Sequence, residues 1–113
     1  MGVVNQKTDI PGPKSNELAI RRKNSVVDAH SSVAPVYTAK AEGATITDVD
    51  GNVFIDFAGG IGAMNTGHGN PVISDEIKSQ VDDYLHVCFT VTPYEPYVAL
   101  AEKLNAMTPG DFP

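Results

Sequence analysis

The glycine-rich stretch 57–71, FAGGIGAMNTGHGNP, contains the residue types whose spacing comes nearest to a known chemical motif. Glycine allows positive φ angles and lets a ligand approach the backbone closely. Residues 62–68 follow the spacing of a phosphate-binding P-loop, but His68 occupies the lysine position and no Ser or Thr follows it. Residues 60–62 begin a dinucleotide-binding fingerprint, but Asn65 replaces its third glycine. Because neither phosphate motif is complete, the stretch predicts either a structural turn or a backbone wall beside a ligand or another chain.

The remaining candidate groups for chemistry are three histidines and one cysteine. His30, His68 and His86 have no neighbour at metal-ligand spacing, and Cys88 is the single thiol. His86 and Cys88 would share a face if they lay in a strand, which would let the imidazole activate the thiol. The more ordinary interpretation is that Cys88 is a small buried apolar residue. The sequence therefore predicts no metal site, and it identifies no hydrolase triad.

Composition restricts the class of protein. The chain has 113 residues, 42% of them apolar, and a net charge of −6, which is typical of one small globular domain. The negative charge disfavours nucleic acid as a partner. No apolar run approaches the length of a membrane span, and the N-terminus lacks a secretory signal. A single cysteine fits a reducing compartment, so we expect a cytoplasmic protein that binds neither nucleic acid nor membrane.

A β-hairpin is predicted where two β-prone runs flank an Asp-Gly pair. Residues 44–49 and 52–57 are rich in β-branched and aromatic side chains, and Asp50 and Gly51 lie between them. Asp-Gly favours a type I′ turn. Residues 37–41 are a candidate third strand.

Helices are predicted on both sides of this hairpin. Residues 1–15 are expected to be a flexible N-terminal arm, because they contain Pro and Gly and little apolar material. Either Ser15 or Asn16 can cap a short helix that ends near Asn24.

Two amphipathic helices are predicted in the second half of the chain. Apolar residues at helical spacing predict one helix over residues 70–85, with Asn70 as its cap. A second helix is predicted to start within residues 93–96, with its apolar stripe running from Tyr97 to Met107. Residues 86–92, between these helices, are β-prone. In its elements alone the chain is of mixed α+β type, with a small antiparallel sheet and two amphipathic helices.

The order of these pieces resembles that of a known enzyme family. DVDGNVFIDFAGGIGAMNTGHGNP followed by HVCFTVTPYEPYVALAEKLNAMTPGDFP is similar to the N-terminal part of the class III (ω-) aminotransferases, in particular those acting on 4-aminobutyrate. The resemblance covers residues 17–113. It implies an α/β fold of fold-type I, pyridoxal 5′-phosphate (PLP) as cofactor, and a homodimer that moves an amino group from an ω-amine to 2-oxoglutarate. Residues 16–113 would be the N-terminal segment of such an enzyme.

The resemblance also assigns residues. Ile61 and Thr90 match positions that line the substrate pocket, and the position of Thr90 is often glutamine in the family. Lys40, Lys78 and Lys103 match no catalytic position. The phosphate cup and the PLP-binding lysine of the family lie beyond the P-G-D-F stretch with which the chain ends, so no catalytic or cofactor-binding residue is assigned.

Two hypotheses from different classes follow. In the first, the chain is part of an aminotransferase, supplies pocket walls, and is inactive in isolation; ornithine aminotransferase is an alternative member of the same family. In the second, the chain is a free-standing interaction module that uses its apolar helix faces to bind a partner. A reading frame that continues beyond codon 113 into a phosphate cup would favour the enzyme.

Overall fold

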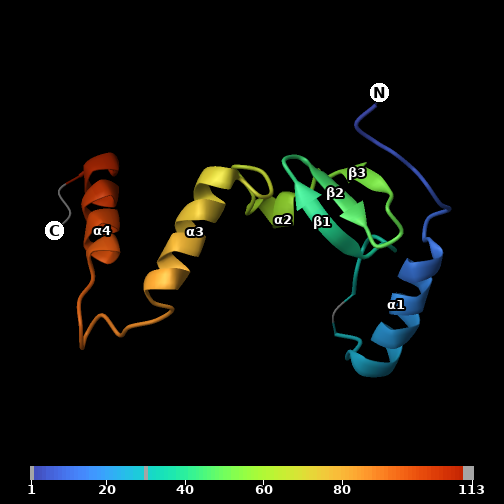
Figure 1. The fold of residues 1–113 in the computed structure, drawn as a ribbon, viewed down its shortest axis with the longest axis horizontal. Helices are drawn as coiled ribbons and strands as arrows, with labels where there is room; N and C mark the ends of the chain where they lie inside the picture. Colours follow the sequence, from blue (N-terminus) through green and yellow to red (C-terminus); the bar gives the residue numbers. More distant parts are fainter. Residues whose placement is uncertain (1, 30, 111–113) are drawn as a thin grey trace. The chain divides into compact units, whose positions relative to one another are not determined.

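The computed structural model describes residues 2–29 and 31–110 and divides the chain into two compact units, residues 1–75 and 76–113 (Figure 1). His30 lies outside the described residues. The described part mixes helices with one small antiparallel sheet, as predicted. None of its helices is long and apolar enough to cross a membrane.

The sheet of the first unit has three antiparallel strands in the order β1 (Thr38–Glu42), β2 (Thr45–Asp48) and β3 (Val53–Ile55). Thr47 pairs with Val53, which confirms the predicted hairpin. β1 confirms the candidate third strand, and its register with β2 shifts near its start. An isolated two-stranded hairpin is only marginally stable in water, and the third strand provides the minimum number of strands for a more stable sheet.

The turn of the hairpin differs from the predicted type I′ turn. Gly51 has a φ of +85°, but Ile61 is the one described non-glycine residue with positive φ, so Asp50 is not left-handed. Gly51 N–H donates to the Asp48 carbonyl, and Asp48 N–H donates to the Asn52 carbonyl. The loop therefore has three residues and ends in a left-handed glycine, which is the other common short hairpin connection. The Asp48 side chain selects it by accepting the N–H groups of Asp50 and Asn52.

The N-terminal segment runs along the hairpin and bonds to it (Figure 1). Asn5 and Val53 exchange two backbone hydrogen bonds of 3.1 and 2.8 Å. The fully buried Asn52 amide accepts the N–H groups of Lys7 and Thr8 through its oxygen. Its nitrogen donates to the Thr8 hydroxyl and to Asp48. These contacts were not part of the prediction of a flexible arm over residues 1–15.

Helix α1 (Pro13–Ser25) begins two residues before the earlier of the two predicted caps, because its N-terminus is capped by the hairpin turn. The Asp50 carboxylate accepts the N–H groups of Lys14 and Ser15 at 2.7 and 2.9 Å, and the Ser15 hydroxyl at 2.7 Å. A carboxylate at this end also suits the helix dipole. The fit is tight, since a Cβ at Gly12 would overlap the Asp50 side chain.

The first unit is held by polar contacts and not by an apolar core. Among the described residues, no apolar side chain is buried, whereas Ser15, Asp48 and Asn52 are 0–2% exposed. All buried side-chain polar atoms in this part of the chain have hydrogen-bond partners. Large apolar residues of this unit, such as Phe57 and Ile61, stay exposed.

The helices α3 (Pro71–Asp83) and α4 (Glu95–Met107) confirm the two predicted amphipathic helices. The Asn70 side chain accepts the Val72 N–H, as predicted for its cap. Thr108 ends α4 by donating its hydroxyl and its N–H to the Leu104 carbonyl.

The β-prone segment over residues 86–92 does not form a strand. It ends in a turn where Val91 and Thr92 donate to the Cys88 carbonyl. β-propensity measures how well side chains fit a pleated sheet, and no neighbouring strand is present in the described part of the second unit. Cys88 is exposed and not buried, which also corrects the interpretation of this thiol.

Asn52→Ala is expected to release the N-terminal segment from the hairpin. The substitution leaves the N–H groups of Lys7 and Thr8 without their acceptor, at a cost of about 1–3 kcal/mol. Amide hydrogen exchange of Lys7 and Thr8 should accelerate accordingly. Asn105→Ala, on the exposed surface of α4, is the matched control. Unchanged protection of both amides in the Asn52 variant would contradict the assigned role.

Candidate functional site

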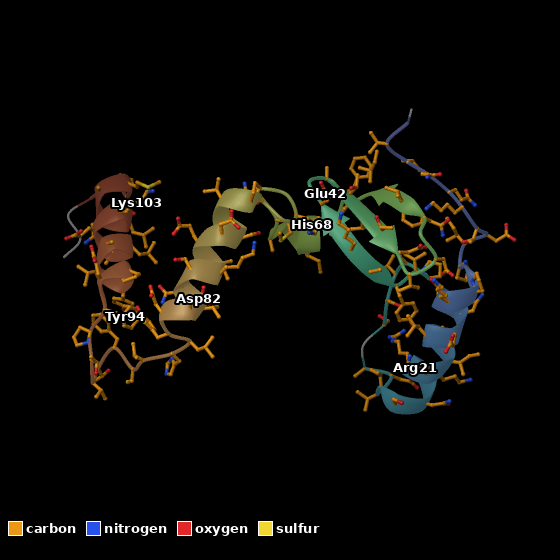
Figure 2. The ribbon with its side chains drawn as sticks, viewed as in Figure 1. Arg21, Glu42, His68, Asp82, Tyr94 and Lys103 are labelled. Atoms are coloured by element: carbon orange, nitrogen blue, oxygen red, sulfur yellow. The ribbon has the colours of Figure 1, made fainter. Side chains whose placement is uncertain are left out.

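The glycine-rich stretch forms a compact loop over residues 57–67 whose two ends lie close together, as in an Ω-loop. Asp56 N–H, before the loop, donates to the Ala44 carbonyl. His68, after it, exchanges two backbone hydrogen bonds of 2.8 Å with Gly43. Figure 2 shows His68 beside the end of the strand that carries Glu42. Both ends of the loop are thus attached to the turn between β1 and β2.

A side-chain pair closes the neck of this loop. His68 Nε2 lies 2.7 Å from Asp56 Oδ2, and the two side chains are 20% and 13% exposed. The other carboxylate oxygen, Oδ1, accepts the N–H groups of Ala58 and Gly59 at 2.9 and 3.0 Å. The hydrogen bond from His68, followed by that from Gly59, lowers the pKa of the Asp56 carboxyl, so the carboxylate is the favoured form.

Ile61 lies at the exposed tip of this loop. Its φ of +59° places a β-branched residue in the left-handed region, at a cost of about 1–2 kcal/mol. The short element α2 (Gly59–Gly62) is interrupted here, because Gly60 and Ile61 both depart from right-handed helical angles. The Ile61 side chain is 98% exposed. The loop therefore holds an apolar side chain outward in a strained conformation, with no apolar cover from the described chain.

Thr90 lies in the turn between α3 and α4, in the second unit, and its side chain is exposed. The preceding residue, Phe89, packs against Tyr97 with ring centroids 4.3 Å apart and meets Tyr94 edge-on at 5.4 Å. Tyr84 approaches Tyr94 at 6.1 Å. This aromatic cluster holds the turn on the N-terminal end of α4. Ile61 and Thr90 belong to different units.

A hollow of about 360 Å³ lies between the loop and the sheet. Asp56 and His68 line it, together with Gly43, Ala44, Gly59, Met64, Thr66 and Gly67. Ile61, with its exposed side chain, is not among the lining residues.

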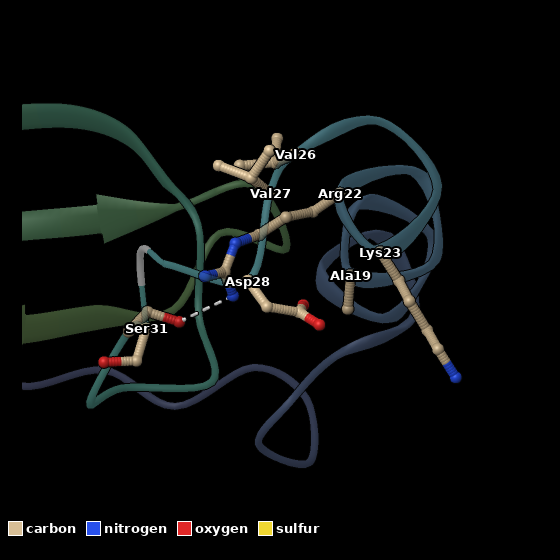
Figure 3. Close-up of a pocket in the computed structure, with 8 residues that line it drawn as sticks. Ala19, Arg22, Lys23, Val26, Val27, Asp28 and Ser31 are labelled. Atoms are coloured by element: carbon tan, nitrogen blue, oxygen red, sulfur yellow. Dashed lines mark hydrogen bonds between the residues drawn. The ribbon is translucent and has the colours of Figure 1, made fainter.

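A second hollow, of about 450 Å³, lies at the C-terminal end of α1 (Figure 3). Arg22, Lys23 and Asp28 line it, and Arg22 donates to the Ser32 hydroxyl at 3.2 Å. It contains neither predicted site residue. With both signs of charge on its walls, it does not indicate one class of ligand.

The described residues do not fit PLP on their own. All six lysines in this part of the chain are exposed, and Lys40 is engaged with Glu42 at the surface. A lysine that carries PLP needs an enclosed setting that favours its neutral amine. Within the described ranges, no three His, Cys, Asp or Glu side chains group as a metal site either.

Asp56 and His68 are the site residues that sequence reasoning missed. His68 was considered only as a failed P-loop lysine or metal ligand. One signal was available: an Asp at the start of a turn tends to accept the N–H two residues on, and Ala58 and Gly59 follow Asp56 at the end of the predicted strand. The pairing with His68, twelve residues later, depends on the path of the loop.

Acid is expected to open the neck of the loop. Because the folded-state pKa of Asp56 is lowered, its stabilisation is complete above the ordinary value of 3.8 and is lost as pH falls through the lowered pKa. The amide ¹⁵N signals of Ala58 and Gly59 should report this titration at a pH below 3.8. The Asp56→Asn variant should lack the transition. A carboxyl pKa at or above 3.8 would contradict the arrangement.

Comparison with known proteins gives a consistent result. The family model for class III aminotransferases matches residues 26–112. The chain is 45% identical over 106 residues to the 4-aminobutyrate aminotransferase of Mycobacterium tuberculosis, covering 94% of this chain and 24% of that protein. It is 42% identical over 101 residues to the 5-aminovalerate aminotransferase of Pseudomonas aeruginosa, covering 88% and 24%. The chain thus spans about a quarter of the length of these curated relatives.

The match extends through the hairpin, the glycine-rich loop and both amphipathic helices, and it bears out the resemblance deduced from the motifs. The chain belongs to the class III aminotransferase family.

Proposed function

We propose that residues 16–113 are the N-terminal segment of a PLP-dependent ω-aminotransferase that transfers the amino group of 4-aminobutyrate, or of a near homologue, to 2-oxoglutarate. Family membership and the names of the relatives support this activity. When bound, PLP stabilises the carbanion that transamination requires. Since the lysines described here are all exposed, we assign the covalent attachment of PLP to another part of the protein.

The role proposed for this chain is to shape the substrate pocket. The observation that carries it is Ile61, a strained and 98% exposed apolar side chain on a loop that is anchored at both ends. Backbone strain of this kind persists where the surrounding structure enforces it, and it concentrates at functional sites. An apolar side chain suits the methylene chain of an ω-amino acid, where each buried CH₂ contributes about 0.8 kcal/mol.

Thr90 is proposed as the second pocket residue. The aromatic cluster around Phe89 fixes the backbone beside it and leaves its side chain free to face a ligand. Threonine is shorter than glutamine, so it leaves more room for a longer amine. That room fits relatives that are named for either a four-carbon or a five-carbon substrate.

The exposed apolar faces support an assembly larger than the described chain. Ile73, Ile77 and Val81 on α3, and Leu100 and Leu104 on α4, are 43–59% exposed. Stripes of this kind are normally buried. We propose that the rest of the protein and the second subunit of a homodimer cover them. A free-standing interaction module would show similar faces, but membership of an enzyme family favours the aminotransferase.

The activity is tested with the product of the complete gene. With PLP saturating, it should form glutamate from 2-oxoglutarate when either 4-aminobutyrate or 5-aminovalerate is the donor. Coupled assay of glutamate measures both donors, and omission of the amine is the control. Failure to turn over either amine would overturn the proposed function.

Ile61→Ala is expected to lower kcat/KM for 4-aminobutyrate on the order of 10-fold, because it removes methylene contacts in the pocket. The shorter side chain also enlarges the pocket, so 5-aminovalerate should lose less. Ile20→Ala, which removes an exposed isoleucine from α1, is the control. Equal kcat/KM values for Ile61→Ala and the unmodified enzyme would contradict the assignment of Ile61 to the substrate pocket.

A further inference from the structure

We propose that Asp56 and His68 are positioning residues that hold Ile61 at the substrate pocket and thereby set selectivity for amine chain length. This inference rests on the proposed function. The two side chains, called here the neck clamp, meet at 2.7 Å across the base of the glycine-rich loop. A series of hydrogen bonds connects the neck clamp to the loop tip.

The clamp rests on a fixed base. His68 is bonded to Gly43 through both its N–H and its carbonyl, and Asp56 is bonded to Ala44. The backbones are also in close approach: a Cβ at Gly67, whose φ is +77°, would lie 3.1 Å from the Gly43 carbonyl oxygen. The His68 end of the clamp therefore cannot shift without disturbing the turn between β1 and β2.

From this base, the Asp56 carboxylate controls the first residues of the loop. Its Oδ1 accepts the N–H groups of Ala58 and Gly59, while its Oδ2 is engaged by His68. Three hydrogen bonds to one carboxylate fix its rotation, because each constrains a different direction of the carboxyl group. Removing His68 frees one oxygen and loosens the orientation of the other.

Ala58 and Gly59, whose N–H groups bond to Asp56, also hold the tip of the loop. The Ala58 carbonyl accepts the Gly62 N–H at 3.1 Å, and the Gly59 carbonyl accepts the Met64 N–H at 2.9 Å. Each of these two hydrogen bonds joins a residue before Ile61 to a residue after it. An unbroken series of hydrogen bonds thus leads from His68 through Asp56 to the peptide units that hold Ile61 in its left-handed conformation.

The strain at Ile61 explains why such a series is needed. An isoleucine prefers to leave the left-handed region, and it stays there only while its neighbours are restrained. Loss of the clamp should let the tip relax and move the side chain. A displacement of about 1 Å at a positioning residue can reduce a rate on the order of 100-fold.

The test compares His68→Ala and Asp56→Ala with Ile61→Ala in the complete enzyme. The decisive quantity is the ratio of kcat/KM for 4-aminobutyrate to that for 5-aminovalerate. Both clamp variants should shift this ratio in the same direction as Ile61→Ala, by on the order of 10-fold. Adding His68→Ala to Ile61→Ala should change the ratio little further, because the clamp acts through Ile61. Asp82→Ala, on the exposed face of α3, is the control for loss of a carboxylate.

A second measurement separates positioning from a general loss of folding. Hydrogen exchange of the Ala58, Gly59 and Gly62 amides should accelerate in His68→Ala, while that of the α4 amides stays unchanged. A clamp that only supported folding would reduce activity toward both amines equally, so an unchanged ratio overturns the proposal. Unchanged exchange at Ala58 and Gly59 overturns it as well. An unmodified enzyme that is inactive toward both amines overturns the proposed function, and exchange then still decides whether the clamp holds the loop.

Discussion

The buried amide of Asn52 is the interaction on which the first unit depends. It satisfies two backbone N–H groups of the N-terminal segment and bonds to Asp48 within the hairpin turn. Two residues earlier, Asp50 caps α1 from the same turn. The hairpin loop and Asn52, the residue that directly follows it, therefore attach the first helix and the N-terminal segment to the sheet. A buried polar network of this kind is stabilising only when all its members are paired, and that condition is met here.

This polar anchoring contrasts with the absence of a buried apolar side chain in the described residues. The hydrophobic effect is normally the dominant stabilising contribution in a domain, yet here the apolar side chains of the loop and of α3 and α4 remain exposed. The chain spans about a quarter of the length of its relatives. Directional hydrogen bonds thus set the local geometry of this segment, while its apolar faces stay exposed in the described residues.

Local signals predicted most of the elements correctly. The hairpin, the third strand, the Asn70 cap and the two amphipathic helices all follow from patterns within about fifteen residues. The errors arose where a side-chain hydrogen bond or a missing neighbouring strand decided the outcome. The Asp48 side chain selected the turn type, Asp50 moved the start of α1, and the lack of a neighbouring strand left residues 86–92 irregular.

The sequence by itself determined the family and the local elements, because motif order and residue periodicity are properties of neighbouring positions. Through the family it also pointed to Ile61 and Thr90, whose roles remain proposals. Only the tertiary structure joined Asp56 to His68 and Asn52 to the N-terminal segment. Such pairs require two segments to meet in space with donors and acceptors aligned within about 3 Å, and that alignment is decided by the path of the chain and not by the identity of either residue.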